Sequence, residues 1–238
     1  MGIHTRTIEY KDGNTVLEAY MGWDDSAGDP RPGVMVSHAW AGRSDLEESK
    51  AEQLAELGYV GVAVDLYGKG VHGQSKEQNA ALMKPLLEDR SMLQRRMKLG
   101  LEQVRKQREV DASRVAAMGF CFGGLCVLDL ARTGADVRGV ASFHGLFGKP
   151  GNTEGNKISA RVLVMHGWDD PMATPDQVLG LTEELSAAGA DWQIHAYGGT
   201  KHAFTNPSAN DPDFGTVYSP DADRRSWQSL QLFLAEIF

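Results

Sequence analysis

The sequence predicts an α/β fold built on a mostly parallel, twisted sheet of about eight strands. Short apolar runs that end in turn residues alternate with longer amphipathic stretches, and the runs are apolar throughout, as in strands buried on both faces. Such an alternation places helices on both faces of the sheet. The chain has 238 residues and shows no repeat or long linker, so we expect a single domain over residues 1–238.

The chain opens with a predicted hairpin and continues with buried strands. The hairpin pairs Thr5–Tyr10 with Thr15–Tyr20, because the Asp12-Gly13 pair between them accepts the positive φ of a tight turn. The strands that follow are predicted at Val34–Ser37, Val60–Asp65, Val115–Phe120, Gly139–Phe143, Val162–His166 and Trp192–Tyr197.

Helices are predicted between these strands. The first, Ser44–Leu57, opens with Ser44 and Glu47 at the spacing of a capping box and stops before Gly58. The others are predicted at Lys76–Leu87, Ser91–Lys106, Gly123–Thr133, Pro175–Ala188 and Arg224–Ile237. Two segments rich in Gly and Pro, Gly145–Gly155 and Gly198–Pro220, are predicted to be loops at a sheet edge, where binding residues commonly lie.

The composition excludes several classes of partner. With 24 Lys and Arg against 32 Asp and Glu, the formal charge is −8, which disfavours nucleic acid and anionic membrane surfaces. No run approaches the roughly 18 apolar residues of a membrane span, and the N-terminus carries no leader pattern. Cys121 and Cys126 are five residues apart at the start of a predicted helix, so their side chains should point in different directions and not meet the geometry of a disulfide. We therefore expect free thiols in the cytoplasm.

Cys121 is the candidate nucleophile. The run Gly119-Phe120-Cys121-Phe122-Gly123 follows a predicted strand and precedes a predicted helix, the setting of a nucleophile elbow. The glycines allow a tight turn, and the helix N-terminus favours negative charge on the sulfur. The alternative is a buried hydrophobic cysteine, the role we expect for Cys126.

A thiol nucleophile needs a base and an acid that orients the base. Asp169 and Asp170 follow one predicted strand and His202 follows the next, in the chain order expected for an elbow enzyme. Either aspartate can be the acid, while the other caps a turn. His38, His144 and His166 also end predicted strands, so they can line the same cleft, hold a metal or form local hydrogen bonds. No spaced ligand motif supports a metal, and none is predicted.

The chain resembles the dienelactone hydrolase family over essentially its whole length. The resemblance rests on Gly-Phe-Cys-Phe-Gly-Gly at 119–124, His-Gly-Trp-Asp-Asp-Pro at 166–171 and His-Ala-Phe-Thr-Asn-Pro at 202–207. It implies an α/β-hydrolase fold without a large lid, no cofactor, and a triad of Cys121, Asp170 and His202. It also implies an oxyanion hole formed by the backbone amides of Trp40 and Phe122.

Two departures from the family pattern affect the expected chemistry. Members often carry a glutamate beside the resting cysteine, and here Ala39 occupies that position. We therefore expect Cys121 to rest more fully as a thiolate against protonated His202. Members that bind anionic dienelactones carry an arginine where this chain has Asn206. Arg90, Arg95 and Arg96 are candidate substitutes, although charge on the surface of a helix is the simpler interpretation of each.

The predicted pocket is neutral and aromatic, lined by Trp40, Phe122, Phe147 and Phe204 beside Ala39 and Asn206. We therefore predict a cysteine hydrolase of neutral or aromatic esters or lactones, a carboxylesterase with a possible promiscuous phosphotriesterase activity. Its partner is a small-molecule substrate, and the chain is expected to be a monomer or homodimer. The alternatives are a thiol redox sensor or a small-molecule binder on the same fold and, among enzymes, a thioesterase or a carbon–carbon hydrolase.

Overall fold

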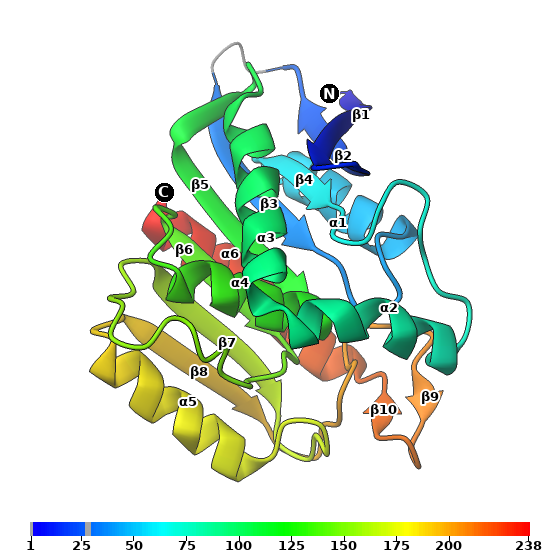
Figure 1. Ribbon diagram of the computed structural model, residues 1–238, viewed down its shortest axis with the longest axis vertical. Coiled ribbons are helices and arrows are strands. Elements are labelled where there is room, and N and C mark those ends of the chain that lie inside the picture. Colours follow the sequence, from blue (N-terminus) through cyan, green and yellow to red (C-terminus); the bar gives the residue numbers. More distant parts are fainter. Residues whose placement is uncertain (1, 27–29) are drawn as a thin grey trace. The chain divides into compact units, whose positions relative to one another are not determined.

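The computed structural model describes residues 2–26 and 30–238 of the chain. These residues form two compact units, Met1–Met118 and Gly119–Phe238, each of which combines strands and helices (Figure 1).

The first unit holds five strands in the order β1-β2-β4-β3-β5. The antiparallel β1 and β2 form the predicted hairpin, β2 pairs antiparallel with β4, and β3 pairs parallel with β4. Every residue of β4 is buried, as the uniform apolar pattern predicted. The strands are β1 (Ile3–Asp12), β2 (Thr15–Asp24), β3 (Arg31–Ser37), β4 (Val60–Val64) and β5 (Val110–Phe120), of which the last two residues of β5 belong to the second unit.

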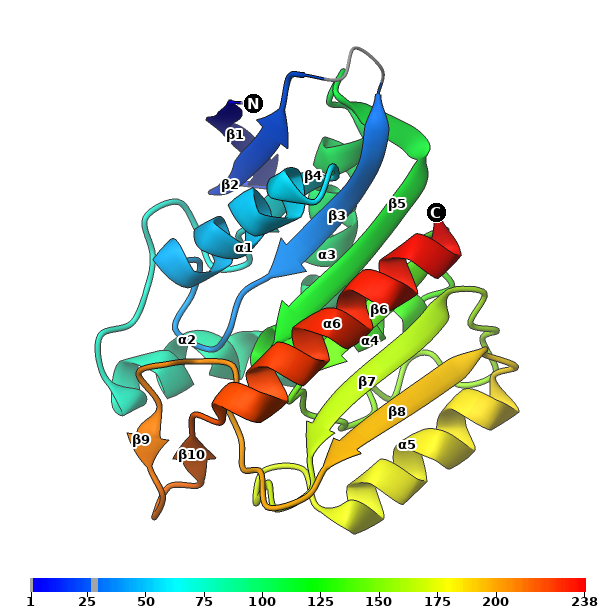
Figure 2. The same ribbon diagram turned by 180° about the vertical axis from the view of Figure 1, so that it is seen from behind.

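The first unit has the helices α1 (Asp45–Glu56), α2 (Lys76–Glu88) and α3 (Arg90–Arg105), of which α2 packs on α3. The predicted capping box at the start of α1 is confirmed, since Ser44 and Glu47 bond reciprocally. Helix α1 packs on β2 and β4, whereas α3 packs on β1 and β3. Figure 1 shows α3 in front of these strands and Figure 2 shows α1 in front of them, so helices cover both faces.

The second unit holds three parallel strands in the order β6 (Gly139–Phe143), β7 (Arg161–Gly167) and β8 (Trp192–Tyr197). Helix α4 (Phe122–Arg132) packs on β6, and α6 (Pro220–Ile237) packs on β6 and β7. The two views place α4 and α6 on opposite faces of these strands. Helix α5 (Pro175–Ala187) connects β7 to β8.

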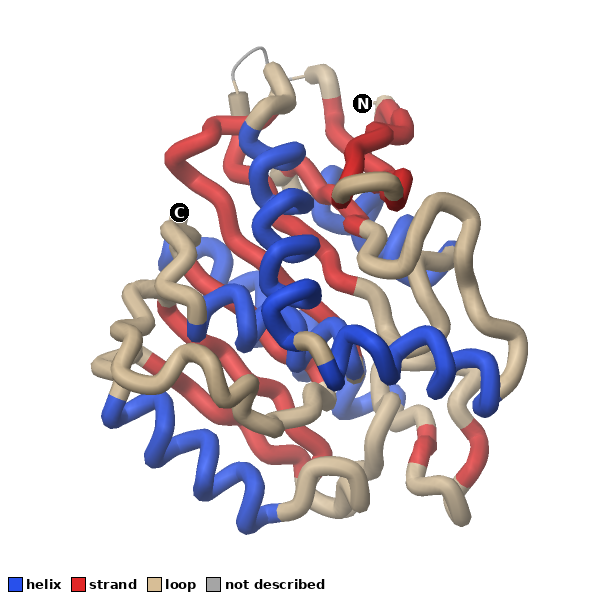
Figure 3. The backbone as a smooth tube through the Cα atoms, in the orientation of Figure 1, coloured by secondary structure: helices blue, strands red, loops and turns tan. Residues whose placement is uncertain are grey.

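The last predicted loop contains structure that the sequence pattern did not indicate. Strands β9 (Asn210–Asp211) and β10 (Thr216–Val217) pair antiparallel (Figure 3). Helix α6 begins at Pro220, earlier than the predicted Arg224, because the Ser219 side chain accepts a hydrogen bond from the Ala222 amide at 3.4 Å and proline suits a first helical turn.

Apart from the short pair β9 and β10, the described residues form five strands in the first unit and three in the second, which make eight, with helices on both faces in each unit. The predicted α/β class with a mostly parallel sheet is therefore confirmed. The interpretation of the chain as a single domain stays a prediction. In the described part of the chain, none of the helices has both the length and the apolar character needed to cross a bilayer.

Candidate active site

The turn between β5 and α4 consists of Cys121 alone, and it has the geometry of a nucleophile elbow. Cys121 has a left-handed φ of 55°, and its amide donates to the Phe143 carbonyl at 3.0 Å. A Cβ atom at position 119 would lie 2.2 Å from the Gly123 carbonyl oxygen, so only glycine fits there. The half-buried Cys121 thus lies in a strained turn between a strand and a helix.

The start of α4 lies close to the end of β6. A Cβ atom at position 124 would stand 2.6 Å from Ser142 Oγ and 2.7 Å from Gly145 Cα, so glycine is required for this approach as well. Phe122 is the first residue of α4, and its side chain is fully buried. Because α4 begins at the residue after Cys121, the partial positive charge of the helix N-terminus lies beside Cys121 and favours negative charge there. Cys126, as expected, is buried.

The structure brings Asp170 and His202 together. His202 Nδ1 donates to Asp170 Oδ2 at 2.7 Å, and both side chains are buried. The other Asp170 oxygen accepts the Met172 amide at 2.8 Å, which fixes the carboxylate. Asp169 is exposed, and only its amide reaches the next loop, donating to the Thr200 carbonyl at 3.0 Å. Of the two candidate aspartates, Asp170 is therefore the one that meets the histidine.

His202 favours its protonated form. Burial lowers its pKa, but the negative charge of Cys121 and the hydrogen bond to Asp170 outweigh burial and raise the pKa to about 10. The charge of Cys121 is the largest of the effects that raise this pKa, and a hydrogen-bonding contribution from Cys121 adds to it. The Nε2 atom has no partner of ordinary hydrogen-bond geometry among the described residues, so we attribute the raised pKa chiefly to charge.

The three other strand-end histidines have different surroundings. His38 is held locally: Nδ1 lies 2.7 Å from the Ala39 carbonyl and Nε2 accepts the Leu66 amide at 3.1 Å. His144 Nε2 lies 2.8 Å from Thr205 Oγ1. Both ring nitrogens of the buried His166 lack a hydrogen-bond partner in the described chain. The interpretation that all three histidines form local hydrogen bonds therefore does not hold for His166.

No metal-binding arrangement is found in residues 2–26 and 30–238, where no three His, Cys, Asp or Glu side chains are grouped to hold an ion. The expectation that the protein works without a metal or cofactor stays a prediction.

The predicted substrate-contacting residues of the second unit are largely buried. Phe147 is 5% exposed, and its ring lies 5.4 Å from that of His166. Phe204 has no exposed surface and packs on His144 and Tyr197. Asn206 forms a turn in which its Oδ1 accepts the Ser208 amide at 2.9 Å. Direct contact of these side chains with a substrate stays a prediction.

In the first unit, the loop after β3 carries Ala39 and Trp40. The Trp40 carbonyl accepts the Tyr67 hydroxyl at 2.9 Å. The Ala39 amide donates at 3.1 Å to Glu47 Oε1, and Glu47 Oε2 accepts the Ser44 amide at 3.0 Å. Glu47 is 1% exposed. The Glu47 carboxylate, from α1, thus accepts a hydrogen bond from Ala39, the position at which family members often carry a glutamate. The sequence indicated Glu47 only as a helix cap.

Glu47→Gln is expected to lower the free energy of unfolding by about 1 to 3 kcal/mol, because an NH₂ group replaces one of two acceptor oxygens. Oε1 accepts the Ala39 amide, and Oε2 accepts both the amide and the hydroxyl of Ser44. Urea unfolding measures the loss. Glu56→Gln, an exposed change on the same helix, serves as the control and should stay within about 0.5 kcal/mol of the unchanged protein. Equal values for the two variants would contradict the assignment.

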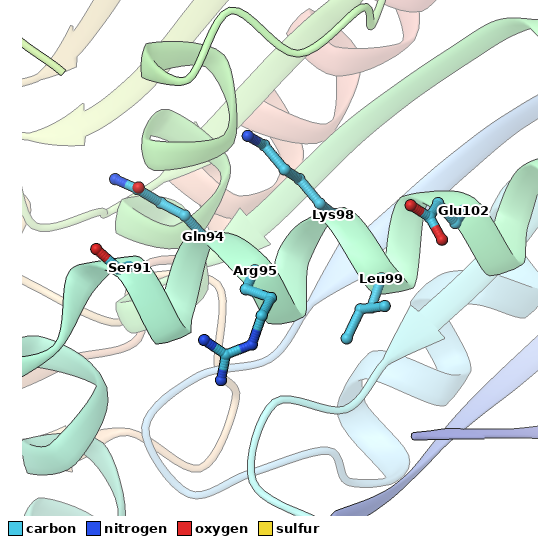
Figure 4. Close-up of a pocket in the computed structure, with 6 residues that line it drawn as sticks. All are labelled: Ser91, Gln94, Arg95, Lys98, Leu99 and Glu102. Carbon is cyan, nitrogen blue, oxygen red and sulfur yellow. The ribbon is translucent and has the colours of Figure 1, made fainter. Parts of the chain in front are cut away.

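Two of the three arginines considered for substrate binding are engaged elsewhere, and a role for Arg90 stays a prediction. Arg95 and Arg96 both pair with Asp12, at 2.7 Å and 2.9 Å. Arg95 also lines a groove of about 370 Å³ along α3, with Ser91, Gln94, Lys98, Leu99 and Glu102 (Figure 4). In that view its guanidinium extends away from the side on which Gln94 and Lys98 lie. Arg95, with a side chain 54% exposed, is therefore a helix-surface charge. Arg96 is not, because its side chain is only 11% exposed and also donates to the Leu66 carbonyl at 2.6 Å.

Comparison with known proteins places the chain in a family. The family model described as "Dienelactone hydrolase family" matches residues 17–238. A solved structure titled "m3DLH" is 35% identical, covers 99% of both chains and has a TM-score of 0.95. A dienelactone hydrolase-like promiscuous phosphotriesterase, P91, from metagenomic libraries is 34% identical over 99% of both chains, with a TM-score of 0.93.

A curated relative from Saccharolobus solfataricus, named "Putative carboxymethylenebutenolidase", is 23% identical over 98% of both chains. The family match spans nearly the whole sequence, and it agrees with the α/β fold and with the elbow at Cys121. The chain therefore belongs to the dienelactone hydrolase family and is a hydrolase that acts on ester or lactone bonds.

Proposed function

We propose that this protein hydrolyses neutral or aromatic carboxylic esters and lactones through an acyl-enzyme on Cys121. The observation that carries the proposal is the buried pair of Asp170 and His202, joined at 2.7 Å, whose histidine is kept protonated by the charge of Cys121. A thiolate in an elbow, an imidazolium and an orienting carboxylate are the parts that nucleophilic acyl transfer requires.

In the proposed reaction the Cys121 sulfur attacks the ester carbonyl, and a tetrahedral oxyanion forms. The Phe122 amide stabilises this oxyanion, a contribution of about 3 kcal/mol in comparable enzymes. The part that the family resemblance gives to the Trp40 amide stays a prediction. Collapse of the intermediate breaks the carbon–oxygen bond, and His202 gives its Nε2 proton to the leaving alcohol. His202 then takes a proton from water, which attacks the thioester and releases the acid and the thiolate.

The acyl-enzyme provides the direct test. Mass spectrometry after rapid mixing with an aryl acetate should show one acetyl group added on the peptide that carries Cys121, and Cys121→Ala should show none. Cys126→Ala is the matched control, because this second thiol is buried, and it should acylate and turn over normally. Turnover that persists in Cys121→Ala would overturn the proposal.

The pH dependence of kcat/KM follows from the raised pKa of His202. A histidine with its ordinary value of about 6.5 loses its proton above neutrality, whereas His202 keeps the proton up to about pH 10. Leaving-group protonation by His202 should therefore persist as pH rises through neutrality, and kcat/KM for an aryl acetate should fall only as pH passes about 10. A decline that begins near pH 7 would contradict this assignment.

The preference for neutral substrates rests on the charges. Asn206 stands where anion-binding members carry an arginine, and Arg95 and Arg96 are paired with Asp12. Without a cation to offset its desolvation, an anionic substrate binds poorly. The ratio of kcat/KM for an aryl acetate to that for a carboxylate-bearing lactone should be well above one. A strong preference for the anion would reject this part of the proposal.

A second candidate activity is hydrolysis of activated phosphotriesters, favoured by the 34% identical relative described as a promiscuous phosphotriesterase. In this reaction the thiolate attacks phosphorus, an aryloxide leaves, and water cleaves the resulting sulfur–phosphorus bond. The Phe122 amide can stabilise the phosphoryl oxygen. Paraoxon should give nitrophenol that depends on Cys121, and no release above the Cys121→Ala background would end this suggestion.

The cellular location belongs with these proposals. Cys121 and Cys126 are both free thiols, which supports a reducing compartment such as the cytoplasm.

A further inference from the structure

His144 lies between two parts of the proposed triad. It directly follows β6, whose last residue, Phe143, accepts the Cys121 amide at 3.0 Å, and its own amide donates to the Met165 carbonyl at 2.8 Å. Its φ of 37° is left-handed, an unfavourable conformation for a residue other than glycine. Such a backbone persists only where surrounding contacts hold it, and it often marks a functional position.

Strained residues gather around the proposed triad. Among the described residues other than glycine, positive φ occurs at Cys121 (55°), His144 (37°) and Ala203 (56°). The first is the proposed nucleophile, the third follows His202, and His144 is the one to which the proposed mechanism gives no role.

With the ring of Phe120 at 6.0 Å, four neighbours fix the side chain of His144. Its ring packs edge-to-face on that of His202, with centroids 5.1 Å apart and an interplanar angle of 66°. Phe204 contacts it at 5.0 Å and 81°, and Thr205 Oγ1 lies 2.8 Å from its Nε2 atom. His144 and Thr205 are each 3% exposed. The Nδ1 atom has no hydrogen-bond partner in the described chain, so Thr205 is the polar group that orients the ring.

His202 needs a contact of this kind. Its bond to Asp170 holds the Nδ1 edge of the ring, whereas Nε2, at the opposite edge, has no partner of ordinary hydrogen-bond geometry within residues 2–26 and 30–238. The His144 ring, packed edge-to-face at 5.1 Å, narrows the range of orientations that the His202 imidazole can adopt.

The charge state of His144 suits the same role. Burial first, and then the positive charge of His202, hold its pKa well below the ordinary value, against an opposing effect from a backbone hydrogen bond. Burial also lowers the pKa of His166, and the neighbours Phe120, Phe204 and Thr205 are uncharged. His144 is therefore neutral while His202 carries a proton, and no like-charge repulsion arises between the two packed rings.

Building on the proposed function, we propose that His144 is a positioning residue for the reaction. Oriented by Thr205, its neutral ring fixes the plane of the His202 imidazole, so that Nε2 stays directed at the Cys121 sulfur and at the leaving oxygen. His144 exchanges no proton with the substrate. Its effect is to keep the proton donor of His202 aligned.

The principal test is His144→Asn. Asparagine adopts left-handed φ readily, so the backbone can stay in place while the ring is lost. A misaligned donor should lower kcat for an aryl acetate by about 10 to 100-fold with KM nearly unchanged. It should also weaken the attraction between Cys121 and His202, so the rate of Cys121 alkylation by iodoacetamide should fall more at about pH 6 than at about pH 9.

Thr205 provides a second and milder test. Thr205→Val removes the hydroxyl that orients His144 and should give a smaller loss of kcat, with the same change in the pH profile of alkylation. Thr205→Ser keeps the hydroxyl and should restore both properties. The matched control is His195→Asn, because His195 forms a similar pair with Ser229 Oγ at 3.0 Å on β8. It should leave kcat and the alkylation profile unchanged.

Thermal unfolding of each variant separates positioning from stability. If His144→Asn lowers the melting temperature but leaves kcat and the alkylation profile of the folded protein unchanged, His144 is merely structural and the inference is overturned. If that variant does not fold, an unchanged kcat and profile in Thr205→Val overturns it equally. Activity that survives Cys121→Ala removes the proposed function itself, whereas a failure at His144 alone leaves that function standing.

Discussion

Asp170→Asn is expected to lower kcat for an aryl acetate by about 10³ to 10⁴-fold, the range found when the orienting carboxylate of a catalytic triad becomes an amide. The Asp170 carboxylate accepts the Nδ1 proton of His202 at 2.7 Å, and its hydrogen bond contributes to the raised pKa of that histidine. An amide lacks the charge and can bind the wrong tautomer. The upper pH limit of kcat/KM should consequently move to lower pH.

Asp169→Asn is the matched control for this experiment. Asp169 is adjacent in sequence but exposed, so its replacement should change kcat less than about twofold. The sequence left the two aspartates as alternatives, and the pair of variants distinguishes them directly. Equal losses in both variants, or a larger loss in Asp169→Asn, would contradict the role assigned to Asp170. Thermal unfolding of both proteins checks that each loss is not a loss of fold.

Arg132→Met is expected to lower the free energy of unfolding by about 3 to 5 kcal/mol, the usual result of removing one partner from a buried ion pair. Arg132 ends α4 and is 2% exposed. Its guanidinium donates to Glu184 at 2.8 Å and 2.9 Å and to Asp129 at 3.1 Å. It also donates to the carbonyls of Phe147 and Gly148. All of these bonds are lost together.

Urea unfolding at constant pH measures this loss. Arg161→Met is the control, because Arg161 pairs with Asp191 at 3.3 Å where both side chains are largely exposed, at 43% and 68%. Pairs of that kind contribute little, so the control should stay within about 0.5 kcal/mol of the unchanged protein. If both variants lower the free energy of unfolding by the same amount, the hydrogen bonds and ion pairs of buried Arg132 contribute no more than an exposed pair does.

The network also bears on the proposed pocket. Because Arg132 holds the carbonyls of Phe147 and Gly148, the helix that begins after Cys121 is tied at its other end to the loop carrying Phe147. A partly folded Arg132→Met protein should therefore lose discrimination between small and bulky acyl groups before it loses turnover of aryl acetate. Comparing acetate and butyrate esters measures this.

Local sequence patterns were sufficient for the elements of the fold. Uniform apolar runs predicted buried strands such as β4 and β6, and the spacing of Ser44 and Glu47 predicted the start of α1. The elbow was also visible, because Gly119 is required by the Gly123 carbonyl only four residues away. Patterns of this kind depend on neighbouring residues, and that is why they can be found in one sequence.

The second short sheet, β9 with β10, was missed for the opposite reason. Its two-residue strands are too short for any periodicity, and they depend on contacts such as the His202 amide donating to the Gly215 carbonyl at 3.0 Å. The start of α6 was misplaced because Pro220 was assigned to the preceding loop, although proline is well suited to a first helical turn.

For the candidate site, the sequence by itself determined which residue types follow which strands: a cysteine in an elbow, two adjacent aspartates, and a histidine after the next strand. Tertiary structure alone decided that Asp170 and not Asp169 meets His202, that Thr205 orients His144 against that histidine, and that Arg132 is buried among acids and carbonyls. Except for the local pair of Arg132 and Asp129, these contacts join residues far apart in the chain. They are strong because the groups are buried away from water. Burial and distance depend on how remote segments pack, which no local pattern of residues encodes.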